Sequence, residues 1–118
     1  VNLPANVGTT AVGTQITIIQ QANLVGSGIL TINANTSNTF ALNSYYSGMN
    51  GGTSRSTPTR PSDVNDRITI TGSDVDGNSA WGTGSVAVFT CVAANKWQFV
   101  MRAESMGTGS DAVAYHTT

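Results

Sequence analysis

The sequence predicts an all-β fold: a single antiparallel β-sandwich or jelly-roll-like domain that spans residues 1–118. Apolar and polar residues alternate with a period of two in several segments, the spacing of strands with one face in a core. No segment shows the spacing of an amphipathic helix. Glycine-containing turn segments separate the alternating ones, at residues 26–28, 76–77, 82–84 and 107–109. A length of 118 residues supports one domain rather than two.

Five segments carry the strand pattern most clearly. In residues 67–71, Ile68 and Ile70 share one face while Thr69 and Thr71 share the other. The other four segments are residues 14–20, 28–33, 85–92 and 96–102. All are rich in β-branched or aromatic residues, which pack well on a pleated surface. Weaker strand signals lie at residues 1–3, 39–42 and 113–115.

Residues 85–92 are apolar on both faces of the expected strand. Val86 and Val88 point to one side, whereas Phe89 and Cys91 point to the other. Such a strand needs cover on both sides, so we expect either a central strand of a sandwich or one covered by a neighbouring subunit. Cys91 is the single cysteine, so it has no intrachain disulfide partner and is expected to be a buried apolar residue.

The aromatic residues divide into two groups. Four of them lie on apolar faces of expected strands and are predicted in the core: Phe40, Phe89, Trp97 and Phe99. Tyr45, Tyr46 and Trp81 lie in segments rich in Asn, Ser and Gly, and are expected at the surface. Exposed aromatic rings beside fixed polar groups are typical of a sugar-binding surface. They are equally typical of a protein interface, and the sequence leaves both interpretations open.

Two segments lack any strand period. Residues 47–66 contain three glycines, two prolines and two arginines, and are predicted to form one long loop. Long loops inside compact domains are usually functional or mobile. We expect this loop either to contact a neighbouring subunit through Arg55 and Arg60, or to be solvated and mobile. Residues 105–118 are predicted to form a flexible C-terminal tail.

Charge is scarce along the whole chain. Charged residues make up 9% of it, and the formal net charge is −1. Thr, Ser, Asn and Gly together account for 53 of the 118 residues. This composition argues against a basic nucleic-acid-binding protein, a coiled coil and charge-driven disorder. No apolar run reaches the roughly 18–20 residues that a membrane helix needs, so neither nucleic acid nor membrane is an expected partner.

Groups that perform catalysis or bind metals are also few. His116 is the single histidine and the third residue from the end of the sequence, so we expect it to be a solvent-exposed tail residue rather than part of a triad. The segment from Asp74 to Asn78 begins like a calcium-binding loop. It then lacks the glycine and the bidentate glutamate of such loops, so a polar turn is the preferred interpretation. We expect no enzyme activity, cofactor or metal site.

The order of the predicted strands carries a resemblance to a known group of proteins. The segments concerned are Leu3-Pro4, residues 13–18, 29–32 and 39–40, then residues 84–89, a short turn and Lys96-Trp97. Together they resemble the small β-domains of tailed-bacteriophage virion proteins, especially C-terminal domains of tail fibres and spikes and capsid-decorating knobs. The resemblance covers residues 1–46 and 66–102. Residues 47–66 and the segment after Glu104 have no counterpart in it.

This resemblance implies a homotrimeric, non-enzymatic structural protein of an extracellular phage particle. Its expected partners are copies of itself and other virion proteins, such as the capsid or a fibre shaft. It would decorate the capsid or form the head of a fibre or spike. The alternative is a lectin-like carbohydrate-binding module of a phage fibre or a secreted bacterial protein, binding host surface glycans through Tyr45, Tyr46 and Trp81. A bacterial adhesin or pilus subunit is a third, weaker hypothesis.

Overall fold

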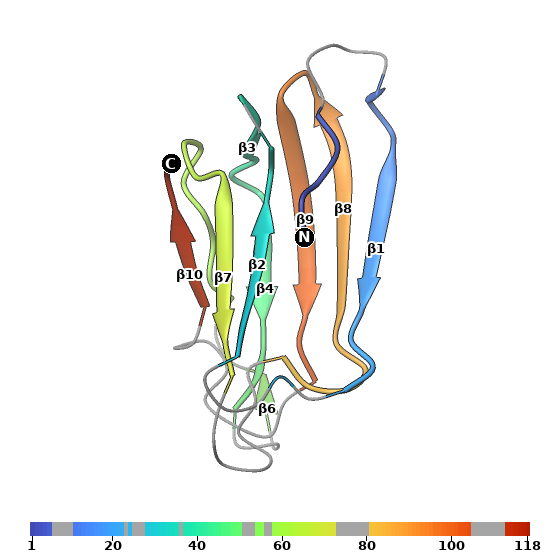
Figure 1. The fold of residues 1–118 in the computed structure, drawn as a ribbon, viewed down its shortest axis with the longest axis vertical. Helices are drawn as coiled ribbons and strands as arrows, with labels where there is room; N and C mark the ends of the chain where they lie inside the picture. The colour runs from blue at the N-terminus through green and yellow to red at the C-terminus, as the bar shows by residue number, and fades with distance from the viewer. Residues whose placement is uncertain are drawn as a thin grey trace.

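The computed structural model is an all-β domain with two main sheets (Figure 1). It describes residues 1–5, 11–22, 24, 28–35, 37–50, 54–55, 58–72, 81–104 and 113–118. Within these residues there is no α-helix, so none is long and apolar enough to cross a membrane. The prediction of an all-β fold is therefore confirmed.

The larger sheet contains five strands. Its order is β1 (Gln15–Ile19), β8 (Val86–Ala93), β9 (Lys96–Arg102) and β3 (Thr39–Phe40), and β4 (Tyr45–Ser47) also pairs with β9. The pairs β1–β8 and β8–β9 are antiparallel. Both β3 and β4 run parallel to β9, so the sheet is mixed rather than purely antiparallel as predicted.

The smaller sheet contains β10 (Val113–His116), β7 (Arg67–Thr71) and β2 (Ile29–Asn33), in that order and antiparallel throughout. The first residues of the chain extend it on the β2 side. Asn2 forms a parallel bridge with Asn33, and the backbone N–H of Leu3 donates to the carbonyl oxygen of Asn33 over 2.9 Å. A separate two-stranded sheet pairs β5 (Met49–Asn50) with β6 (Ser54–Arg55).

The two main sheets share one apolar core. In the smaller sheet, Ile32 and Ile68 lie opposite each other and are fully buried. In the larger sheet the buried positions alternate along β8 and β9, so that Phe89 pairs with Phe99. The ring of Phe99 stacks on that of Tyr115 in β10, with centroids 6.1 Å apart, and thus joins the two sheets. The predicted core positions of all four aromatic residues and of Cys91 are confirmed.

The predicted strands agree closely with the observed ones. All five strong segments form strands, and residues 67–71 and 96–102 match β7 and β9 exactly at both ends. The weaker segment 113–115 lies in β10, so the prediction of a flexible tail is wrong for residues 113–116. Residues 47–66 also contain more structure than one loop: they hold β5 and β6, and Thr59 bridges to Tyr46.

Candidate functional site

The aromatic residues predicted to lie at the surface do not form a binding platform. Tyr46 and Trp81 are both 0% exposed, so the expectation of exposure is wrong for these two. Tyr46 is paired with Met101 on the core face of β9, whereas its neighbour Tyr45 points outward and is partly buried. Strand alternation places adjacent residues on opposite faces, so two consecutive tyrosines cannot both stack on one ligand.

The other predicted site residues are scattered. Arg60 is exposed, and Arg55 lies in β6, where its side chain is outside the described part of the structure, as is the whole segment from Asp74 to Asn78. His116 is not an exposed tail residue: it belongs to β10, is partly buried, and lies 2.8 Å from Thr69 (Nε2 to Oγ1). The described residues contain no group of three or more His, Cys, Asp or Glu side chains that could hold a metal.

The outer face of the larger sheet carries an apolar surface that we call the valine face. It consists of Ile19, Val86, Val88, Val100 and Tyr45. These residues come together because they occupy outward positions on four neighbouring strands. Ile19 lies opposite Val86, Val88 lies opposite Val100, and Val100 is in register with Tyr45.

The valine face meets solvent in the isolated chain. Ile19 is 63% exposed, and the other four residues are partly buried. In contrast, the inward-facing neighbours Ala87, Phe89 and Met101 are fully buried. Sequence reasoning identified the two-faced character of β8, but not the partners that neighbouring strands add to it.

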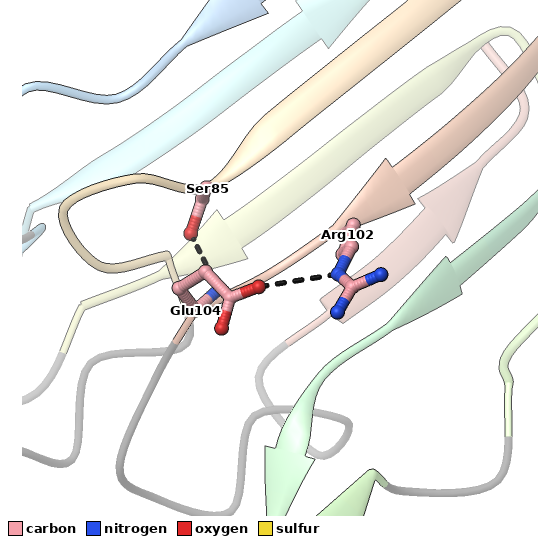
Figure 2. A network of polar contacts seen from close by, with 3 residues as sticks. All are labelled: Ser85, Arg102 and Glu104. Carbon is pink, nitrogen blue, oxygen red and sulfur yellow. Dashed lines mark hydrogen bonds and ion pairs between the residues drawn. The ribbon is translucent and has the colours of Figure 1, made fainter.

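Polar contacts border the valine face at the end of β9 (Figure 2). Arg102 Nε lies 3.2 Å from Glu104 Oε1, and Ser85 Oγ accepts a hydrogen bond from the backbone N–H of Glu104 over 2.9 Å. The Arg102 side chain is 68% exposed, and exposed ion pairs contribute little to stability. At the other end of β9, Lys96 Nζ donates to Thr39 Oγ1 and to the carbonyl oxygen of Asp63, over 2.7 and 2.9 Å. Lys96 therefore lies at the far end of β9, whereas Arg102 lies directly opposite Val86 and next to the apolar residues of the valine face.

A second surface is an open pocket of about 650 Å³ that we call the polar pocket. Four asparagines contribute to its lining: Asn2, Asn33, Asn35 and Asn38. Asn33 Nδ2 donates to Asn2 Oδ1 over 2.8 Å, and Asn35 Nδ2 donates to the carbonyl oxygen of Leu3 over 3.0 Å. The bridge between the first residues and β2 therefore holds amide side chains in place along the pocket.

Hydroxyl groups and one carboxylate complete the lining of the polar pocket. The hydroxyl residues are Ser37, Thr39, Thr117 and Thr118, and the remaining two residues are Asp66 and Val64. The carboxylate of Asp66 accepts hydrogen bonds from both the backbone N–H and the hydroxyl of Thr118. Val64 is 55% exposed and adds the one large apolar side chain of the lining.

Sequence reasoning missed the polar pocket. Its local signal is the asparagine-rich run at residues 33–38, which joins β2 to β3 and in which Asn35 and Ser37 have positive φ angles of 74° and 64°. The rest of the lining comes from residues 2, 64, 66, 117 and 118, and only folding brings these positions together. Comparison with protein-family models, curated proteins and solved structures finds no match to the chain.

Proposed function

We propose that this protein is a non-enzymatic structural subunit of a tailed-phage particle, which assembles as a homotrimeric β-knob on the capsid or at the head of a fibre or spike. The valine face is the observation that supports the proposed assembly. The assignment to a phage particle rests on the sequence resemblance to small virion β-domains.

The valine face favours association between copies of the chain. Covering apolar surface is the main favourable term in protein association, and the core of an interface is typically depleted in charge and rich in aromatic residues. The five residues of the face include Tyr45 and none of them is charged, and the charged neighbour Arg102 opposite Val86 is paired with Glu104. It also continues to β1, the last strand on that side of the sheet, and association that covers such an edge prevents uncontrolled strand pairing.

A second copy is the partner that fits this face best. Arg102, which lies opposite Val86, is already paired with Glu104, so two valine faces can approach each other without an unpaired cation between them. Most soluble oligomers are closed and symmetric assemblies of one chain, in which a repeated surface is covered without leaving an open end. The trimer itself is the symmetry that the resemblance to virion domains implies.

A structural role also agrees with the chemistry of the described residues. Of the three described carboxylates, that of Asp63 is exposed in a turn. The single histidine is engaged with Thr69, and the carboxylates of Asp66 and Glu104 bond to Thr118 and Arg102 respectively. General acid–base catalysis needs a titratable group held beside a substrate, usually with its pKa matched to the working pH. These side chains are instead used in contacts between strands and turns.

Two measurements test the proposal. Light scattering at micromolar concentration should give about three times the chain mass of 12.2 kDa. A stable monomer at that concentration would overturn the assembly. Imaging of intact particles with an antibody against the chain should then locate it: labelling over the whole head indicates capsid decoration, and labelling at the distal tail indicates a fibre or spike. Absence of the chain from purified particles would overturn the phage assignment.

A further inference from the structure

We infer that the polar pocket binds a neutral carbohydrate through the asparagine and hydroxyl side chains that line it. This inference goes beyond the proposed structural role and does not depend on trimer formation. The volume of about 650 Å³ lies within the range of roughly 300–1,000 Å³ that is typical of small-molecule sites. A pocket of this size holds one or two sugar rings.

The lining offers the hydrogen-bond chemistry that a sugar needs. Each hydroxyl of a sugar both donates and accepts a hydrogen bond, and an asparagine amide carries two N–H donors and an oxygen acceptor on one rigid group. The bond between Asn33 and Asn2 uses one N–H of Asn33 and engages the oxygen of Asn2. The pair therefore retains both donor and acceptor capacity towards the pocket while its side chains are held in place.

The charge of the lining excludes other ligand classes. Asp66 is the one charged side chain among the lining residues, and no lysine or arginine accompanies it. Phosphate or sulfate would meet the Asp66 carboxylate, which is unfavourable, and the Lys96 ammonium beside the lining residue Thr39 is already engaged with Thr39 Oγ1 and the carbonyl oxygen of Asp63. A hard cation would prefer several carboxylates, whereas both oxygens of Asp66 already accept hydrogen bonds from Thr118. A neutral ligand with many hydroxyls fits this lining best.

Asp66 and Val64 would fix the orientation of a bound sugar. A carboxylate held by two hydrogen bonds is a strong and fixed acceptor for a sugar hydroxyl. Val64 presents an exposed apolar surface on which the C–H side of a sugar ring can lie. The lining has no aromatic ring, so we expect millimolar affinity for a monosaccharide and tighter binding for an oligosaccharide that fills the pocket.

Nuclear magnetic resonance tests the site directly on the wild-type chain. Titration with a binding sugar should shift the backbone amide signals of residues 33–38 and 64–66. The sugars to test are glucose, galactose, mannose and N-acetylglucosamine, followed by the best hits of a glycan array. Asn33→Ala should weaken the binding at least fivefold, because it removes the amide that Asn2 orients. Asn43→Ala is the matched control: Asn43 is exposed, lies outside the pocket lining, and its loss should leave binding unchanged.

A second variant guards against misfolding of the first. If Asn33→Ala loses the native spectrum, Thr117→Ala at an exposed lining position should lower the affinity at least twofold with the fold intact. Several results would overturn the inference. The first is the absence of any shift with a neutral glycan. The second is shifts outside the pocket that Asn33→Ala and Thr117→Ala leave unchanged. The third is a stronger shift of the pocket amides with inorganic phosphate or calcium than with sugars. Equal loss of binding with Asn43→Ala would also overturn it.

Discussion

The hydroxyl oxygen of Ser44 accepts a hydrogen bond from the backbone N–H of Phe99 over 2.9 Å, at a position where both residues are buried. The reason lies in how β9 is paired. β3 pairs with residues 96–97 and β4 with residues 100–102, which leaves Phe99 between them. Ser44 lies in the turn that joins β3 to β4, so its side chain replaces the missing strand partner.

Ser44→Ala should therefore lower the free energy of unfolding by about 1–3 kcal/mol, the usual cost of leaving a buried donor unsatisfied. Urea denaturation monitored by circular dichroism measures this change. The matched control is Ser62→Ala, because the Ser62 hydroxyl also forms a hydrogen bond within a turn, donating to Asn65 Oδ1 over 3.0 Å, but is exposed. A change above about 0.5 kcal/mol is not expected there. Equal losses for the two variants would contradict the role given to Ser44.

Val88→Lys tests the valine face as the surface of association. Val88 and Val100 lie directly opposite each other at its centre, so an ammonium group there would be buried without a partner in the assembly. We expect the dissociation constant of the oligomer to rise more than tenfold, which corresponds to about 1.4 kcal/mol or more. Analytical ultracentrifugation over a concentration series measures this.

The control for Val88→Lys is Thr71→Lys. Thr71 is exposed at the end of β7 and points away from the core of the smaller sheet, opposite Ile29. Its substitution should leave the assembly intact, and both variants should keep the circular dichroism spectrum of the wild type. Assembly that survives Val88→Lys, or that Thr71→Lys disrupts to the same extent, would place the interface elsewhere.

Deprotonation of the Tyr115 phenol should lower the stability of the protein in alkaline solution. Burial raises its pKa above the ordinary value of 10.0, whereas a hydrogen bond with Thr59 opposes this shift. The folded state therefore holds the phenol proton more tightly than the unfolded state. The resulting stabilisation is complete below pH 10 and is lost as the pH rises from about 10 through the pKa of the folded state.

Comparison with Tyr115→Phe isolates this effect from other groups that titrate at high pH. The variant loses the hydroxyl contacts with Thr59, at 2.9 Å to its Oγ1 and 3.0 Å to its carbonyl oxygen, so it should be less stable at neutral pH by about 0.5–1.5 kcal/mol. Thermal unfolding between neutral pH and about pH 11 should show this difference narrowing as the pH rises. A difference that is constant, or that widens with pH, would contradict the raised pKa.

The fluorescence of Trp81 and Trp97 should show that both side chains are buried and do not contact a ligand. Both are at most 1% exposed, so the fluorescence of the folded chain should be blue-shifted relative to free tryptophan and poorly quenched by iodide. Trp81→Ala should destabilise the protein by about 3–5 kcal/mol through the cavity it leaves. Strong quenching of the folded protein, or a stable Trp81→Ala variant with altered glycan binding, would instead favour the surface position that the sequence suggested.

The strands could be predicted because the period of two is local. Ile68 and Ile70 alternate with Thr69 and Thr71 whatever lies beside them, and β7 begins and ends where that alternation does. The short parallel strands could not be predicted in the same way. β3 and β4 together contain five residues, and their pairing is set by β9, more than fifty positions further along the chain.

The candidate surfaces show the same division. Tyr46 and Trp81 lie in polar segments that suggested exposure, but the local composition does not say which side of a sheet a side chain occupies. Only part of the valine face, the second apolar side of β8, could be predicted from the sequence. The polar pocket was not visible, because Asn2, Asn33 and Asp66 become neighbours only when the first residues pair with β2 and the chain before β7 closes the same end.

Side-chain alternation and composition act within a few residues, so an all-β chain with little charge, most of its strands and most of its aromatic core could be predicted from the sequence. The tertiary structure decided which apolar side of the larger sheet stays uncovered and which polar residues meet around a pocket. Both depend on register between strands far apart in the sequence, and a shift of one residue would move every side chain to the opposite face.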